Sequence, residues 1–358
     1  MQQISFDSPS TPFFATLRKR VNQYFKENEI PKSGNLHLHL KSTFQACTAI
    51  LLFVVLVFFT PGTMISIALC VLMGINMAIL GFNVMHEGGH QTFSKHKWLN
   101  NTSAFTLNLL GGTIWFWKIK HNINHHTFTN IEGKDDDIDV KPFMRLHEEQ
   151  THHKAHRFQH WYCFILYGIS HFVWLFWDDF EKYFTGRLLE KGNTMPVSQH
   201  IVFWSTKLVY IGVYMILPII MVGLVPAIIG FSIASFVCGL TLAIVFQLAH
   251  VVEDTQFPAP HEHTGKVGNE WAVHQMNTTA NFATKNKFVS WMLGGLNFQV
   301  EHHLFPQISH VHYPKVNEIV KATCEEYNVT YIEYESMIKA IGAHLSHLKA
   351  LGRVPETA

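Results

Sequence analysis

Four long apolar runs constrain this sequence more than any other feature does. Two of them, about residues 44–60 and 63–86, are joined through the turn residues TPGT, and two more, about 201–222 and 226–250, through GLVP. Helices rise about 1.5 Å per residue, so runs of this length cross a hydrocarbon core of about 30 Å. The sequence therefore predicts an all-α integral membrane protein whose four transmembrane helices form two hairpins.

The composition agrees with a membrane protein and argues against several other classes. Hydrophobic residues make up 48% of the chain and charged residues only 15%. The net charge is +1, so no strong overall field would attract nucleic acid. The five cysteines include no C-x-x-C pair, and four of them lie in apolar stretches. Neither a disulfide framework nor a thiolate site is therefore indicated.

The positions of basic residues predict the orientation in the membrane. Neither turn contains Lys or Arg, whereas the basic segments SKHKW, WKIKH and HKAHR lie between or outside the hairpins. Because cytoplasmic loops carry the excess of basic residues, both termini and the central loop are expected in the cytoplasm. The first 43 residues are polar, so no cleavable signal peptide is expected.

We expect three regions along the chain. Residues 1–43 form a cytoplasmic N-terminal segment with an interfacial helix, 44–315 form the main domain with a cytoplasmic helical cap, and 316–358 form a cytoplasmic helical tail. Segments 103–117 and 161–177 are apolar but short and rich in Trp and Phe. These features favour helices that lie in the interface or cover a site, although the second segment also fits a strained span.

Histidine is unusually abundant and is arranged in clusters. The chain has 25 histidines, nearly as many as its 26 Asp and Glu residues. Three clusters place imidazole or amide side chains about one helical turn apart. They are HEGGH (His86, His90), HNINHH (His121, His125, His126) and QVEHH (Gln299, His302, His303). Residues at i and i+3 or i+4 share one face of a helix, which is what a metal site built from helix ends requires.

The predicted spans bring the clusters to one membrane face. His86 follows Pro61 by 25 residues, which as a helix is roughly 37 Å, so it emerges at the cytoplasmic surface. His250 follows Pro226 by 24 residues and is expected at the same depth, although it belongs to no cluster. The other two clusters are cytoplasmic by the same topology. A single pair of histidines is weak evidence, but eight at one interface predict a metal site.

Eight imidazoles exceed what one metal ion takes, so two ions with four or five ligands each fit the count. An all-imidazole set leaves zinc, copper, iron and nickel open. Metal-bound histidines usually donate their other N–H to an oxygen. The candidates for that role or for further ligation are Glu87, Asp136, Asp137, Gln299 and Glu301. The acidic run DDDID, which supplies the two aspartates, fits a solvated loop equally well.

The remaining histidines carry weaker signals. Those in LHEEQTHHKAHRFQH, residues 146–160, alternate with charged residues and fit a solvated or headgroup-facing helix. We expect no ligand from this stretch.

The order H-x3-H, H-x3-HH, Q-x2-HH, with apolar hairpins before the first and third boxes, resembles the membrane-bound fatty acid desaturases over roughly residues 40–315. The resemblance implies a di-iron centre at the cytoplasmic face, where O2 is activated and two hydrogens are removed from an acyl chain to leave a cis double bond. It implies two Fe2+ ions as cofactors and electrons from outside. The residues that match the family's ligands are His86, His90, His121, His125, His126, His302 and His303, with His250 as the additional ligand at the end of the fourth span.

The resemblance also bears on selectivity and partners. The glutamine of the third box, Gln299, is similar to that of front-end desaturases, which insert a double bond between an existing one and the carboxyl end. Many of those enzymes carry a fused b-type cytochrome with a His-Pro-Gly-Gly motif, which the N-terminal region here lacks. A ferredoxin or a free b-type cytochrome with its reductase is the expected donor. This feature and HQMNTTANF, residues 274–282, resemble bacterial members, so a bacterial inner membrane is expected.

The expected substrate is a fatty acyl chain linked to a lipid, coenzyme A or a carrier protein. Its tail would enter a tunnel lined by the helices and by segment 103–117, with Trp115 and Trp117 either at the mouth or in the interface belt.

Three alternatives remain open at this point. A membrane hydroxylase would use the same metals to place oxygen on carbon. A metal transporter should carry its histidines at mid-membrane, whereas these lie at the ends of spans. A hydrolase with one zinc ion needs fewer ligands.

Overall fold

The computed structural model describes residues 4–8, 11–188 and 194–353, which form two compact units. The first unit contains the residues up to Ser33, Lys120–Cys163 and the residues from Val245 onward. The second contains Gly34–Ile119 and Phe164–Ile244. Most of the described backbone is helical, and the four strands are only two residues long each, in agreement with the all-α prediction.

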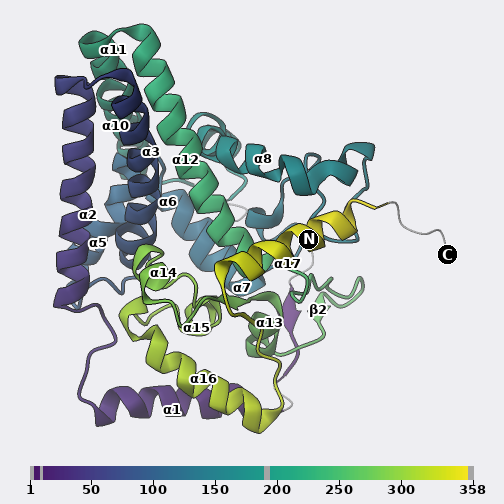
Figure 1. Ribbon diagram of the computed structural model, residues 1–358. Coiled ribbons are helices and arrows are strands. Elements are labelled where there is room, and N and C mark those ends of the chain that lie inside the picture. The colour runs from purple at the N-terminus through teal and green to yellow at the C-terminus, as the bar shows by residue number, and fades with distance from the viewer. Residues whose placement is uncertain (1–3, 9–10, 189–193, 354–358) are drawn as a thin grey trace. The chain divides into compact units, whose positions relative to one another are not determined.

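The second unit holds the long apolar helices (Figure 1). Its helices are α2 (Leu36–Val54), α3 (Thr63–Leu80), α4 (His86–Gly89), α5 (Lys97–Leu109), α6 (Ile114–Trp117), α9 (Asp179–Thr185), α10 (Val197–Ile211) and α11 (Leu217–Val222), with π-helical stretches at Val55–Phe59, Gly81–Met85, Trp174–Asp178 and Gly212–Ile216. Three further elements have residues in both units: the π-helical stretch Lys118–His125, α8 (Gln159–Val173) and α12 (Leu224–His250).

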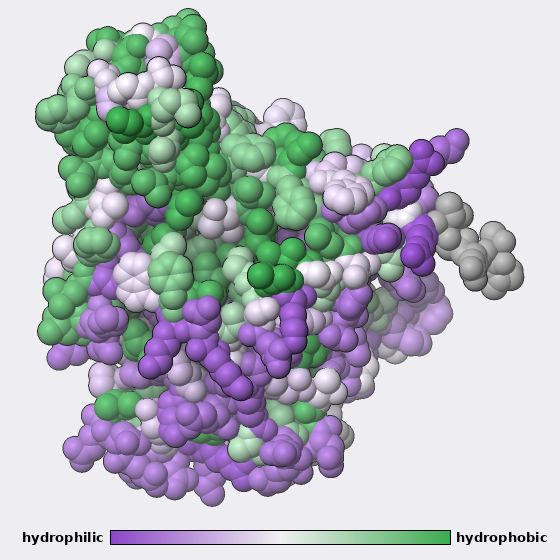
Figure 2. Space-filling view, viewed as in Figure 1, coloured by the Kyte–Doolittle hydropathy of each residue, from purple (hydrophilic) through white to green (hydrophobic). Residues whose placement is uncertain are grey.

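Four continuous helical segments are long and apolar enough to cross a membrane, which confirms the predicted number of spans for the described residues. They are Leu36–Phe59, Thr63–Gly89, Val197–Val222 and Leu224–His250. Large apolar side chains on them are exposed, including Leu51, Phe59 and Ile220. Figure 2 shows the resulting hydrophobic surface over the long helices. Such a surface suits contact with lipid chains.

Two boundaries differ from the prediction for local reasons. The first span begins at Leu36 instead of near residue 44, because the Asn35 side chain accepts a hydrogen bond from the backbone N–H of Leu38 and caps the helix. The second turn lies at Gly223, whose φ of +90° suits glycine. Pro226 is in the first turn of α12, where a proline costs no helical hydrogen bond.

The two short apolar segments form helices outside the four spans. Segment 103–117 divides into α5 and α6 around a break at Leu110–Thr113. Segment 161–177 lies in α8 and the π-helical stretch that follows it. Trp161 and Trp177 in the latter segment are 73% and 68% exposed. Exposed Trp on a helix too polar to span is typical of a membrane interface.

The first unit combines short helices with two small parallel sheets. Its elements are β1 (Ser5–Phe6), α1 (Phe13–Glu27), α7 (His126–Phe128), β2 (Lys266–Val267), α13 (Trp271–Thr278), β3 (Asn281–Phe282), α14 (Lys287–Met292), α15 (Gln299–Leu304), α16 (Tyr313–Tyr327), β4 (Glu333–Tyr334) and α17 (Met337–Leu351), with 3-10 turns at Asp136–Ile138, Lys154–Phe158 and His310–His312. Strand β1 pairs with β2 and β3 with β4.

Helices α1 and α16 lie side by side and build the largest core of this unit (Figure 1). The buried stripe of α1 repeats every four residues, at Phe13, Leu17, Val21 and Phe25. It packs with α15 residues such as Val300 in the same core. The apolar face of α1 is therefore covered by protein, and α15, which carries the third histidine box, is supported from behind.

We expect Leu17→Ala to weaken this core. Leu17 is fully buried, so truncation should lower the free energy of unfolding by about 2–5 kcal/mol. The measurement is the thermal unfolding midpoint of the purified protein in detergent micelles. The exposed neighbour Lys19, changed to Ala, is the control and should stay within about 0.5 kcal/mol of the wild type. Equal midpoints for the two variants would contradict the packing of α1.

Candidate metal centre

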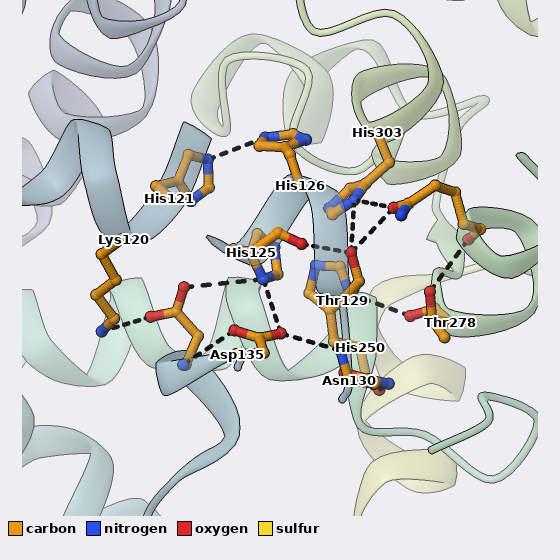
Figure 3. Close-up of polar contacts among 12 residues, drawn as sticks. Lys120, His121, His125, His126, Thr129, Asn130, Asp135, His250, Thr278 and His303 are labelled. Carbon is orange, nitrogen blue, oxygen red and sulfur yellow. Dashed lines mark hydrogen bonds and ion pairs between the residues drawn. The ribbon is translucent and has the colours of Figure 1, made fainter. Parts of the chain in front are cut away.

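Three buried histidines from distant parts of the chain meet in the first unit (Figure 3). His125 precedes α7, His250 is the last residue of α12, and His303 lies in α15. A ring nitrogen of each lies within 4.8 Å of one from the other two. The ring centroids are 4.7–4.9 Å apart, and no side chain is more than 1% exposed. Three nitrogen donors at this spacing fit one metal ion with room for further ligands.

The Nδ1 atom of each ring already faces an oxygen acceptor. His125 Nδ1 lies 3.0 Å from Asp135 Oδ2, and His250 Nδ1 lies 3.2 Å from the carbonyl oxygen of Thr278. His303 Nδ1 lies 2.8 Å from Gln275 Oε1. These contacts place the proton on Nδ1 and the lone pair on Nε2, the arrangement that metal-bound histidines show.

His250 gives the clearest test of whether the residues fit a metal ion. Its side chain is fully buried, and its Nε2 has no hydrogen-bond partner in the described part of the chain. A buried polar atom normally has a partner, because leaving it unpaired costs free energy. A lone pair held among two other imidazoles is explained if it coordinates a cation. The donor set therefore fits a metal ion.

The acidic loop after the second box holds His125. Asp135 is buried and also accepts hydrogen bonds from the backbone N–H groups of Asn130 and Asp137, each at 3.0 Å. Burial by itself would lower the pKa of His125, but the charge and hydrogen bond of Asp135 raise it above its usual value. Asp137 Oδ2 is 3.8 Å from His125 Nδ1, and Asp137 Oδ1 is 2.6 Å from Lys120 Nζ. Asp135, next to the predicted Asp136 and Asp137, is thus the direct partner of the ring.

The second box is not the regular α-helix that its spacing suggested. Lys118–His125 is π-helical, and α7 begins at His126. A π-helix has a wider turn, so His121 lies near residues both four and five positions ahead. Its ring is 5.1 Å from that of His125, and its Nε2 is 3.3 Å from His126 Nε2. The wider turn brings three imidazoles of one short segment together.

The third box presents both histidines to this group. The His302 ring is 4.6 Å from the His126 ring, and His302 Nδ1 is 3.1 Å from the Tyr313 hydroxyl. Gln299 is buried at the first position of α15, one turn before His302. All of these side chains belong to the first unit, and His125, His126, His302 and His303 are at most 5% exposed.

Glu301 occupies a separate buried polar cluster. Its carboxylate accepts hydrogen bonds from Asn281 Nδ2 at 2.7 Å, Asn317 Nδ2 at 3.0 Å and the Tyr331 hydroxyl at 3.3 Å. Burial raises the pKa of Glu301 to about 6, although these donors oppose the shift. The Asn281 side chain also accepts from the backbone N–H of Val300 at 2.8 Å. Glu301 thus anchors α15 to neighbouring elements.

The first box lies in the second unit and is shaped by its glycines. The rings of His86 and His90 are 4.6 Å apart, and each meets the edge or face of Trp117 at 5.6–5.7 Å. A Cβ on Gly89 would lie 2.3 Å from the Trp117 ring, and one on Gly88 would lie 2.3 Å from the backbone of α5. HEGGH therefore needs glycine where neighbouring segments approach most closely. Glu87 is buried and accepts a hydrogen bond from the Thr92 hydroxyl at 2.9 Å.

The histidines of residues 146–160 mostly serve structural hydrogen bonds. His156, for example, contacts the carbonyl oxygen of Pro142 at 2.9 Å. His147 shares a group of metal-compatible side chains with Glu132 and Glu149. Lys141 Nζ already lies 2.6 Å from Glu132, so the protein supplies a cation there itself.

Several residues that complete the centre were not predicted. The segment HQMNTTANF contributes Gln275, Thr278 and Asn281, and the helix end after the second box contributes Thr129 and Asn130. All five are at most 1% exposed. The sequence did contain a signal for them. Residues 274–282 combine several amide and hydroxyl side chains at helical spacing with no charged residue, and a solvated loop does not require that pattern.

The comparisons with known proteins agree with this geometry. The model of the fatty acid desaturase family matches residues 61–335. The chain is 33% identical to sn-1 linoleoyl-lipid 6-desaturase of Arthrospira platensis over 354 aligned residues. The alignment covers 97% of this chain and 95% of that protein. It is 34% identical to the enzyme of the same name from Synechocystis sp., over 95% of this chain and 96% of that protein.

A plant relative extends the comparison to another regioselectivity. The acyl-lipid (8-3)-desaturase of Physcomitrium patens is 34% identical over 97% of this chain and 73% of that protein. The chain therefore belongs to the fatty acid desaturase family, and it is an integral membrane oxidoreductase that desaturates fatty acyl chains.

Proposed function

We propose that this protein is a front-end acyl-lipid desaturase with a di-iron centre, and that it inserts a cis double bond between an existing double bond and the carboxyl end of a lipid-linked chain. The buried group of His125, His250 and His303, each with Nδ1 held by an oxygen, carries the metal part of the proposal. The similarity to the linoleoyl-lipid desaturases of Arthrospira platensis and Synechocystis sp. supports the lipid-linked substrate, and the Q-x-x-H-H form of the third box supports the regioselectivity.

The proposed ligands divide between two iron ions. His125, His250 and His303 would hold the first. The other box histidines would serve the second: His86, His90, His121, His126 and His302. The assignment of His86 and His90 rests on the box pattern of the sequence. Gln299 would ligate or orient a metal ion from the start of α15, while Asp135 and Asp137 fix the ring of His125.

Bound iron would supply the strong oxidant, made from O2 and external electrons, that an unactivated methylene group requires. The protein's own groups have a different task. They would hold eight imidazoles as neutral donors to the metal ions and keep bulk water away through burial. No protein side chain needs to act as a general acid or base in this proposal. The electron donor is proposed to be a separate ferredoxin or a b-type cytochrome with its reductase.

The proposed topology places the chemistry at the cytoplasmic face of the membrane. Two hairpins would cross the bilayer, with the turns at Thr60–Gly62 and Gly223 on the far side and both termini in the cytoplasm. The exposed apolar residues of α8 and α9, among them Trp161, Ile165 and Phe184, would lie in the interface. A bacterial inner membrane is the proposed location.

Expression in a host that makes linoleoyl lipids but no further polyunsaturated chains tests the function. The wild-type protein should yield one new fatty acid with an added cis double bond on the carboxyl side of the existing bonds. Mass spectrometry of derivatised fatty acids locates that bond. A hydroxylated product, or a new bond on the methyl side of the existing ones, would contradict the proposal.

His250→Ala tests the ligand that no sequence box contains. The variant should lose iron and product together. Substitution of a residue that only hydrogen-bonds to a metal ligand typically lowers metal affinity by about 10–100-fold, and the loss of a ligand itself should lower it further. Iron per purified protein and product per cell are measured together. The exposed His263, changed to Ala, is the control and should retain both. Normal iron content in His250→Ala would remove this residue from the ligand set.

Gln299→His tests the unusual position in the third box. Imidazole can ligate or orient a metal ion at least as well as an amide, so iron content and most of the activity should be retained. The assay is the same product analysis with metal quantification. Loss of activity with full iron content would show instead that the amide has a role that imidazole cannot fill.

A further inference from the structure

The segment HQMNTTANF forms α13 and β3, and the reaction itself does not explain its buried polar residues. Gln275, the second residue of this segment, is fully buried. Its Oε1 lies 2.8 Å from His303 Nδ1 and 2.9 Å from the Thr129 hydroxyl. The Thr129 hydroxyl also lies 2.7 Å from the carbonyl oxygen of His125. One amide oxygen thus connects the second and third histidine boxes.

The identity of the atom that faces His303 decides which ring nitrogen can bind a metal ion. A neutral imidazole carries its proton on one nitrogen and its lone pair on the other. An oxygen at Nδ1 can only accept, so the proton stays on Nδ1 and the lone pair on Nε2. An amide NH2 in the same place would favour the opposite tautomer. The proton would then lie on Nε2, where it would compete with a cation.

The second end of the Gln275 amide supports this orientation. Its Nε2 is buried and has no hydrogen-bond partner in the part of the chain that the structure describes. An unpaired buried donor is unfavourable. The amide is therefore held through its oxygen, which accepts from His303 Nδ1–H at 2.8 Å, even though its nitrogen gains nothing. The single hydroxyl hydrogen of Thr129 lies between this oxygen and the His125 carbonyl and can go to only one of them at a time. This is expected if the function of the residue lies in the acceptor.

We propose that Gln275 is a positioning residue that fixes the Nδ1–H tautomer of His303 and so directs Nε2 of that ring toward a metal ion. This inference rests on the proposed metal centre and deepens it. Among the three clustered rings, His125 uses a carboxylate and His250 a backbone carbonyl as acceptor. Only His303 has an uncharged side chain as its nearest acceptor, since Gln275 Oε1 lies 2.8 Å and the Thr129 hydroxyl 3.3 Å from its Nδ1. A single substitution at Gln275 can remove that nearest acceptor or keep it with a changed charge.

The experiment compares full-length variants in detergent micelles. Gln275→Leu removes the nearest acceptor of His303 and leaves only the more distant Thr129 hydroxyl, Gln275→Glu keeps the nearest acceptor, and Gln159→Leu is the matched control. Gln159 is also fully buried in the first unit, and its amide makes three hydrogen bonds, to the backbone of Arg145 (at its N–H and its carbonyl) and of Leu348, at 2.8–3.0 Å. Cobalt(II) is the probe. Its affinity is measured by chelator competition and its ligand field by visible absorption.

We expect Gln275→Leu to bind the first-site cobalt about 10–100-fold more weakly and with an altered spectrum. The cobalt affinity of Gln275→Glu and of Gln159→Leu should stay within about threefold of the wild type, which is well below the loss expected for Gln275→Leu. Wild-type affinity in Gln275→Leu, or equal losses in Gln275→Leu and Gln159→Leu, would overturn the inference while leaving the metal centre intact. Failure of the wild type to bind cobalt would overturn the proposed centre and the inference together. If Gln275→Leu does not fold, Gln275→Glu decides alone, because weak binding there would show that an acceptor is insufficient.

Discussion

The structure of the centre depends on pairing the buried imidazoles of His125, His250 and His303 with an oxygen at Nδ1. Buried polar groups without partners are costly, and a group of imidazoles could satisfy one another through N–H···N contacts that would consume their lone pairs. Asp135, Gln275 and the Thr278 carbonyl prevent this for His125, His303 and His250. The lone pairs are thereby directed inward as a set. Side chains that contact no metal therefore determine what the histidines can do.

This pairing demands rigid surroundings, which the short helices of the first unit supply. Helix α15 is only six residues long, and an isolated helix of that length is unstable in water. The Glu301 cluster with Asn281, Asn317 and Tyr331 fixes it on one side. The apolar core that contains Val300, Leu304 and the stripe of α1 supports it on the other. Polar contacts set the position of the helix, while apolar burial provides most of the stabilising free energy.

The sequence was sufficient for features that depend on local pattern. Apolar runs predicted the four candidate spans, and box spacing and span length pointed to histidines that the fold brings together, His250 among them. Features that depend on tertiary packing were not accessible. Neighbouring aspartates look alike in a sequence, so only the fold of the loop distinguishes Asp135 from Asp136. The Glu301 carboxylate likewise bonds to Asn281, Asn317 and Tyr331, residues that are distant in the sequence, and no local pattern indicated the π-helical turn before His126.

The end of α12 shows how an apolar helix can present an imidazole at the point where its apolar sequence ends. The helix carries no charged residue from Leu224 to Ala249, and a titratable imidazole stands only at its last residue, where polar and ionisable groups cost less than inside the bilayer. Helix ends leave carbonyl groups without intrahelical partners. Here Asn130 Nδ2 and the Thr255 hydroxyl both donate to the carbonyl oxygen of His250 at 2.8 Å. The contacts that terminate α12 therefore also hold the His250 ring beside His125 of the second box, with the two ring centroids 4.7 Å apart, so that one helix terminus ends the apolar segment and fixes the position of this imidazole.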